Sequence, residues 1–135
     1  ELQFIETEEP YPVAMLDDIK LYFNHYKTAE EAREKWEERK KRMHMDNLYI
    51  LMCDRDGITE DDMRKLEQVD CKNKVVLTAK PHPDIDFAFQ LPEYANEDYV
   101  GYYLGKNAIT DKTVVEKHFD FVKWLNGASP KDCHL

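Results

Sequence analysis

The stretch from Ile19 to Lys80 alternates short apolar runs with longer charged segments, and this alternation constrains the fold more than any other feature. The apolar runs predict strands and the charged segments predict helices, in the order strand, helix, strand, helix, strand. Strands that are joined through helices usually run parallel. We therefore expect an α/β protein with an open, mostly parallel three-layer βαβαβ sheet and a C-terminal helix.

The first predicted strand shows period-two alternation, which is typical of strands. One of its faces carries the side chains of Ile19, Leu21, Phe23 and His25. This pattern places His25 at the carboxyl end of the strand, on the core side. The helix that follows is predicted to begin after Thr28, a good N-cap residue, and to end near Met43.

The next two predicted strands are the continuous apolar runs 48–53 and 75–79, as expected of strands that are covered on both faces. The helix between them is predicted to begin after Thr59. A leader over residues 1–12 and a short strand over 13–16 come first.

After Lys80 the pattern weakens. Residues 87–91 could form a short strand, and residues 93–109 give no clear assignment. A final helix is predicted from Thr110 to Asn126, where Gly127 follows as a stop signal.

The composition excludes several classes of protein. The net charge of −9 argues against general binding to nucleic acids or anionic membranes. No apolar run is long enough to cross a membrane and no signal peptide is visible. The odd number of cysteines, three without a CxxC pair, argues against a disulfide framework or a zinc site. We expect a cytoplasmic single domain over residues 1–135, without a predicted metal and with the cofactor and oligomeric state left open.

Polar clusters follow each of the three predicted strands, at residues 25–27, 54–57 and 80–83. Parallel strands would gather these clusters at one edge of the sheet, where open α/β sheets bind their ligands. His25 could act there as a general base or bind an anion. The alternative is a structural histidine that bonds to a neighbouring side chain.

Arg39 and Arg42 lie three residues apart on the first predicted helix and could grip a phosphate or carboxylate together. The alternative is pairing within the chain, with Asp17, Asp18 or another acidic residue.

Asp54 and Asp56 could contact a sugar hydroxyl or a cation, although the surrounding residues fail the calcium-loop template. The alternative for this pair is a turn that leads into the next helix. Lys80 and His82 could supply positive charge at the same edge. The chain has no GxGxxG, GxxxxGK[ST], GxSxG or HExxH motif, so no phosphate loop or hydrolase signature is present.

Several spaced residues carry a family resemblance. They are Tyr11-Pro12-Val13, Leu16-Asp17-Asp18-Ile19, His25-Tyr26, Ala32, Trp36, Arg39, Arg42 and Asp46-Asn47-Leu48. Over about residues 2–92 the chain resembles a family of uncharacterised bacterial proteins, a domain of unknown function often found with genes for capsule or exopolysaccharide synthesis. The resemblance implies an α/β fold and the C-terminal portion of a longer protein. Ala14 departs from it, because glycine is usual there.

Some members of that family are loosely described as acyl- or glycosyltransferases. The resemblance therefore implies a protein of surface-polysaccharide assembly that transfers a group to or from a sugar or nucleotide sugar. The residues expected to be catalytic are His25 and Asp54, and those expected to bind substrate are Tyr26, Arg39, Arg42, Asp56, Lys80 and His82. The alternative is a non-catalytic module in which the tyrosines of residues 94–103, or a surface at Phe121 and Trp124, bind a glycan or a protein.

Overall fold

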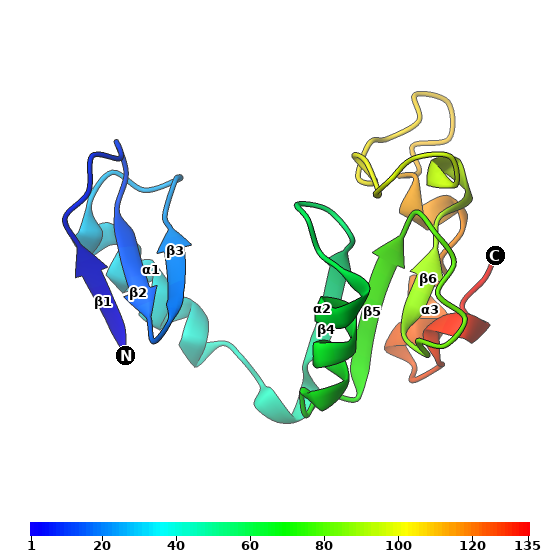
Figure 1. The fold of residues 1–135 in the computed structure, drawn as a ribbon, viewed down its shortest axis with the longest axis horizontal. Helices are drawn as coiled ribbons and strands as arrows, with labels where there is room; N and C mark the ends of the chain where they lie inside the picture. Colours follow the sequence, from blue (N-terminus) through cyan, green and yellow to red (C-terminus); the bar gives the residue numbers. More distant parts are fainter. The chain divides into compact units, whose positions relative to one another are not determined.

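The computed structural model describes all residues 1–135, which divide into two compact units, 1–46 and 47–135 (Figure 1). Each unit has its own three-stranded sheet, so the protein is a mixed α/β structure with two sheets, of which one is parallel. The single domain expected from the sequence stays a prediction.

The first unit is an antiparallel sheet of the strands β1 (Leu2–Ile5), β2 (Val13–Leu16) and β3 (Ile19–Tyr22), in the order β1-β2-β3, with one helix, α1 (Ala29–Lys41). β2 occupies the residues predicted for it. A tight turn separates it from β3, and Asp17 adopts a φ of 54° within that turn.

Helix α1 begins where the sequence predicts. The Thr28 side chain accepts a hydrogen bond from the Glu31 backbone N–H, which caps the first turn. Ala32 is fully buried, and Trp36 packs edge-on against Phe23 with a centroid distance of 6.1 Å. Phe23 in turn lies 5.5 Å from Phe4 of β1. These contacts hold the helix against the sheet and form the small core of the first unit.

The second unit is built on a parallel sheet of β4 (Tyr49–Cys53), β5 (Asn73–Thr78) and β6 (Ala88–Gln90), in the order β4-β5-β6. Its helices are α2 (Glu60–Lys65) and α3 (Phe121–Leu125). Short 3₁₀ helices complete the chain at Met45–Asn47, Leu66–Gln68, Pro92–Tyr94, Val115–Lys117 and Pro130–Asp132. None of the helices is long and apolar enough to cross a membrane.

Two hydrophobic clusters cover opposite faces of this sheet. Alternate residues of β5 point to either side, so Val75 and Leu77 join one cluster and Val76 joins the other. The larger cluster is completed by residues from the C-terminal part of the chain, and the smaller by Met63 and Leu66 of the α2 region. The parallel pairing of β4 with β5 and the burial of both faces of β5 agree with the prediction from the sequence.

The prediction is wrong about the first strand. β3 pairs antiparallel with β2 and belongs to the sheet of the first unit, not to the parallel sheet. The physical reason is the two-residue turn at Asp17 and Asp18, which joins two apolar runs too closely for a crossover and leaves an antiparallel hairpin. The strand also ends at Tyr22, so His25 lies beyond it and is exposed.

The prediction of one long final helix is also wrong, since only Phe121–Leu125 are α-helical. Asp120 ends the preceding segment, and its side chain caps α3 by accepting a hydrogen bond from the Lys123 backbone N–H. Because α3 begins at Phe121 and not at the predicted Thr110, the Trp124 side chain faces the core and is only 4% exposed. The surface expected at Phe121 and Trp124 therefore does not form.

Helix α2 is too short to be stable by itself, and we expect its capping to matter. The Thr59 side chain accepts from the Asp62 N–H, and Asp62 accepts from the Thr59 N–H and hydroxyl, a complete capping box. Thr59→Ala should lower the free energy of unfolding by about 1 kcal/mol. Urea titration measures this loss. Thr59→Ser keeps the hydroxyl and should retain most of the stability. Equal losses of stability in both variants would contradict the role of the Thr59 hydroxyl as the cap of α2.

Candidate functional site

The carboxyl edge of the parallel sheet is organised by Asp54, the first residue after β4. One carboxylate oxygen, Oδ2, accepts a hydrogen bond of 2.7 Å from the Ala79 N–H at the end of β5. The other, Oδ1, accepts one of 2.6 Å from the Val100 N–H. Asp54 therefore joins two strand ends to a segment almost fifty residues further along the chain, and both of its oxygens are engaged.

The segment that Asp54 holds is a loop over residues 92–103, which we call the tyrosine loop. Lys80, just after β5, donates a hydrogen bond of 2.9 Å from Nζ to the Ala95 carbonyl oxygen in this loop. Val100 is fully buried and belongs to the larger core cluster. The loop is thus anchored by Asp54, by Lys80 and by one buried side chain.

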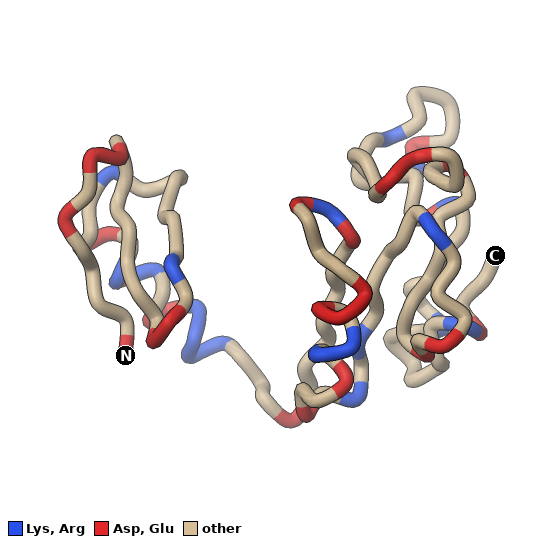
Figure 2. The backbone as a smooth tube through the Cα atoms, in the orientation of Figure 1, with Lys and Arg blue, Asp and Glu red and all other residues tan.

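The tyrosine loop forms a pocket of about 360 Å³, lined by Glu93, Tyr94, Glu97, Asp98, Tyr99 and Gly101. Figure 2 shows acidic residues on the segment after β6. Glu93, Glu97 and Asp98 of the pocket belong to this segment. Tyr99 is 53% exposed, whereas Tyr94 is half-buried and packs against the larger core cluster. The pocket therefore combines one fixed and one accessible aromatic ring with three carboxylates.

The tyrosines that reach the core stay protonated. Burial raises the pKa of Tyr94, with a further increase from Glu93 and an opposing decrease from Arg55. Burial also raises the pKa of Tyr103, with an increase from Cys53 and the same opposing effect of Arg55. Both phenols are consequently neutral at physiological pH, so the Tyr94 hydroxyl can donate a hydrogen bond as well as accept one.

One carboxylate of the pocket has a partner outside it. Oε2 of Glu93 lies 2.6 Å from Nε2 of His118, an ion-pair distance, although the two groups lack the alignment of a hydrogen bond. The ion-pair contacts of the structure include none for Glu97 or Asp98, and both are exposed. These two carboxylates are therefore available to accept hydrogen bonds from a ligand.

Gly101 fits the pocket because it has no side chain. A Cβ atom at this position would meet Cε1 of Tyr94 at 2.7 Å, which is shorter than van der Waals contact allows. We expect Gly101→Ala to displace the Tyr94 ring, to lower the free energy of unfolding by about 1–3 kcal/mol and to deform the pocket. Urea titration measures the stability, and Asn96→Ala in the same loop is the control. Equal stability of the two variants would contradict the close packing.

The structure brings together some of the residues predicted for the site. Asp54 and Lys80 both hold the tyrosine loop, as described. Asp56 is exposed, with a φ of 59° in the turn that leads to α2, which fits the alternative interpretation of this pair. His82 pairs with Glu60 of α2, with 3.4 Å between Nδ1 and Oε2.

The other predicted residues belong to the first unit. His25 is exposed. The Arg39 guanidinium lies over the Tyr26 ring at 5.8 Å, a cation–π contact. Arg42 lies 3.7 Å from Glu38 on the same helix, the kind of pairing within the chain that the alternative expects. Whether these residues contact a substrate stays a prediction.

Tyr94 and Tyr99 line the pocket and belong to the tyrosines that the alternative interpretation expects to bind a glycan or a protein, whereas Glu97 and Asp98 are missing from the predicted site residues. The sequence carries a signal for these residues, since residues 93–103 contain four tyrosines and three acidic residues. What the sequence does not show is the hydrogen bond from Val100 to Asp54, which brings this loop to the edge of the sheet. The structure contains no group of three or more histidine, cysteine or acidic side chains arranged to hold a metal ion.

The chain is a mixed α/β protein with two sheets, and a pocket lies at the carboxyl edge of the parallel sheet. The family model that matches residues 1–126 is described as Domain of unknown function (DUF1919), and the chain belongs to this family. It is also similar to a protein of Haemophilus influenzae (strain ATCC 51907 / DSM 11121 / KW20 / Rd) named "Uncharacterized protein", with 41% identity over 127 residues. That similarity covers 94% of this chain and 61% of the relative, so the chain spans less than two thirds of its relative's length.

The resemblance to a family of this description is thus confirmed. Its link to polysaccharide synthesis and the C-terminal position of this segment stay predictions.

Proposed function

We propose that this chain binds a sugar in the pocket of the tyrosine loop and serves as a glycan-binding module in surface-polysaccharide assembly. The observation that carries the proposal is the pocket itself, in which two tyrosines and three carboxylates line a cavity of about 360 Å³. Its place at the carboxyl edge of a parallel sheet is the usual position of ligand sites in α/β proteins.

The lining of the pocket suits the two kinds of surface that a sugar presents. The C–H face of a pyranose ring is apolar and packs on an aromatic ring, a role that fits the exposed Tyr99. The hydroxyl groups of the sugar are hydrogen-bond donors, which carboxylates accept strongly. Glu97 and Asp98 fit this second role, and the neutral Tyr94 hydroxyl can serve a sugar oxygen as a donor.

The charge of the pocket selects among sugars. Three carboxylates and no cation line it, so an anionic ligand would meet like charges at short range. We therefore expect neutral sugars and amino sugars to bind, and uronic acids and nucleotide diphosphate sugars to be rejected. A neutral glycan is therefore a better ligand for this pocket than an activated sugar donor, which carries a negatively charged diphosphate.

Group transfer by His25 and Asp54 stays a prediction, and the geometry supports it less than binding. Both oxygens of Asp54 already accept backbone hydrogen bonds, so a proton transfer through this carboxylate would break one of the contacts that form the pocket. We assign Asp54 to the positioning of the tyrosine loop.

The experiment that tests the proposal is a calorimetric titration with galactose, glucosamine and glucuronate, which are a neutral, a cationic and an anionic sugar. We expect glucosamine and galactose to bind and glucuronate not to bind. Tyr99→Ala should weaken binding by about tenfold, which corresponds to roughly 1.4 kcal/mol of lost aromatic contact.

Tyr102→Ala is the matched control, because Tyr102 belongs to the same loop and is 71% exposed but does not line the pocket. Its sugar affinity should equal that of the unmodified protein. Preferred binding of glucuronate, or equal losses in the two tyrosine variants, would overturn the proposal.

A further inference from the structure

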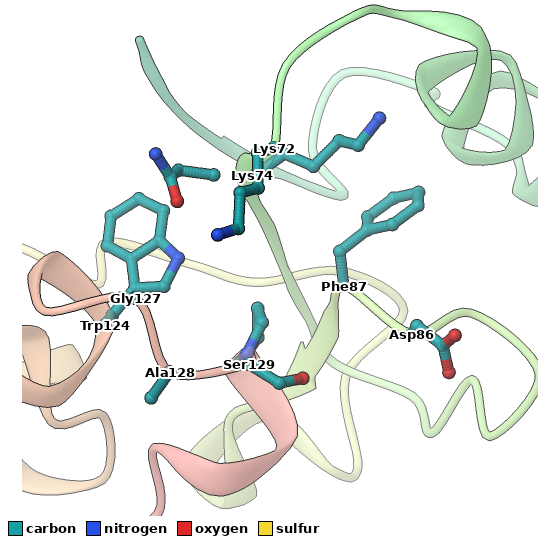
Figure 3. A pocket seen from close by; sticks show the side chains of 10 residues that line it. Lys72, Lys74, Asp86, Phe87, Trp124, Gly127, Ala128 and Ser129 are labelled. Carbon is teal, nitrogen blue, oxygen red and sulfur yellow. The ribbon is translucent and has the colours of Figure 1, made fainter. Parts of the chain in front are cut away.

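A second cavity lies at the opposite, amino-terminal edge of the parallel sheet (Figure 3). It has a volume of about 300 Å³ and is bordered by the first residues of β5, by Phe87 before β6 and by residues 127–130 after α3. This volume is at the lower end of the range for small-molecule sites. The cavity shares no residue with the pocket of the tyrosine loop.

Two of the residues that line this cavity, Trp124 and Phe87, are aromatic and almost fully buried. Trp124 and Phe87 are 4% and 7% exposed, and Figure 3 shows them on opposite sides of the cavity. Trp124 packs edge-on against Tyr49 at 5.2 Å and against Phe119 at 5.7 Å, so its orientation is determined by the core behind it. The cavity thus offers the edge of an aromatic ring on two of its sides, and the Lys74 ammonium group lies 5.6 Å from the centroid of the Phe87 ring.

Two of the charged side chains that line the cavity, Lys74 and Asp86, already have partners within the chain. The Lys74 ammonium group donates hydrogen bonds to the carbonyl oxygens of Leu66 and Val69, at 2.8 and 2.9 Å. Asp86 pairs with Lys131, at 2.8 Å between Oδ1 and Nζ.

Lys72 differs from these residues. It lines the cavity and is exposed, and it takes part in none of the ion pairs or hydrogen bonds within the chain. No carboxylate of the chain pairs with Lys72 or with Lys74, so the cavity is locally positive on a protein whose net charge is −9, and only the Lys72 ammonium group is without a hydrogen bond. An anionic group is the natural partner of such a charge.

We propose that this cavity binds a small aromatic anion, whose ring packs between Trp124 and Phe87 and whose charged group pairs with Lys72. The aromatic walls give affinity for the ring, and the free ammonium group discriminates between ligands by charge. The ligand class is thus an aromatic carboxylate or a compound of similar shape and charge. This site is independent of the sugar pocket, so either proposal can fail without the other.

The two tryptophans of the chain provide the readout. Trp36 lies in the first unit and Trp124 lines the cavity, so the two indole N–H signals of a nuclear magnetic resonance spectrum separate specific from non-specific binding. The probes are 1-naphthoate, the neutral 1-naphthalenemethanol and the cationic 1-naphthylmethylammonium. We expect 1-naphthoate to shift the Trp124 signal in a saturable way and to leave the Trp36 signal in place.

The variant Lys72→Met should weaken 1-naphthoate binding by about fivefold, the factor that one partly exposed ion pair supplies. It should also leave the affinity for the neutral probe unchanged. Lys117→Met removes an exposed lysine outside the cavity and should have no effect on either probe. The proposal is overturned by an absence of any Trp124 shift up to the solubility limit of 1-naphthoate, by equal shifts of both indole signals, or by equal affinity for all three probes.

Discussion

Asp54→Asn should lower the free energy of unfolding of the second unit by about 2–3 kcal/mol, because the amide can accept only one of the two backbone hydrogen bonds that the carboxylate accepts. The side-chain nitrogen would face a second donor, either the Ala79 N–H or the Val100 N–H. The loop that Val100 anchors should then loosen, and sugar binding should fall with it. Urea titration gives the stability change, and calorimetry with galactose gives the change in affinity.

Asp56→Asn is the control for this prediction. It makes the same chemical change two residues away, at an exposed position whose φ of 59° asparagine tolerates well. Its effect on stability should stay within about 0.5 kcal/mol. If both variants lost the same stability, the effect would come from net charge, and the clamp assigned to Asp54 would be contradicted.

Phe119→Ala should be the most damaging substitution in the core of the second unit. The side chain is 1% exposed and packs against Phe89 at 4.9 Å, Phe121 at 5.0 Å and Trp124 at 5.7 Å. Its removal would leave a large cavity in the cluster that covers one face of the parallel sheet. We expect a loss of about 3–5 kcal/mol in the free energy of unfolding, measured by urea titration.

The control is Val122→Ala. Val122 lies in α3, three residues after Phe119, but is 70% exposed. Its replacement should change the free energy of unfolding by less than about 0.5 kcal/mol. A loss for Phe119→Ala that is no larger than the loss for Val122→Ala would show that this aromatic cluster does not stabilise the second unit.

The sequence predicts the parallel sheet well where local patterns decide the structure. The apolar runs 48–53 and 75–79 correspond to β4 and β5 within one or two residues at each end, and the helices after Thr28 and Thr59 begin at the predicted caps. These features depend on neighbouring residues. The pairing of β3 depends instead on the competition between a near hairpin partner and a distant parallel one, and the short turn at Asp17 decides in favour of the hairpin.

The candidate site was only partly predictable for a similar reason. Asp54 and Lys80 follow strands directly, so the pattern identifies them as residues of the sheet's carboxyl edge. Their roles depend on hydrogen bonds to Val100 and Ala95, which lie far away in the chain. No periodicity in the tyrosine loop reveals that it returns to this edge. Long-range hydrogen bonds between a side chain and the backbone leave no local trace in a sequence.

The central claim is that the tyrosine loop, held by Asp54, binds a sugar against Tyr99. The most direct test is a measurement of intermolecular nuclear Overhauser effects between galactose protons and the aromatic ring protons of the protein. Our account predicts contacts from the C–H face of galactose to Tyr99 and Tyr94, and their loss in Asp54→Asn. Contacts to tyrosines outside the pocket alone, such as Tyr22 or Tyr102, or the absence of any contact under conditions where galactose binds, would contradict it.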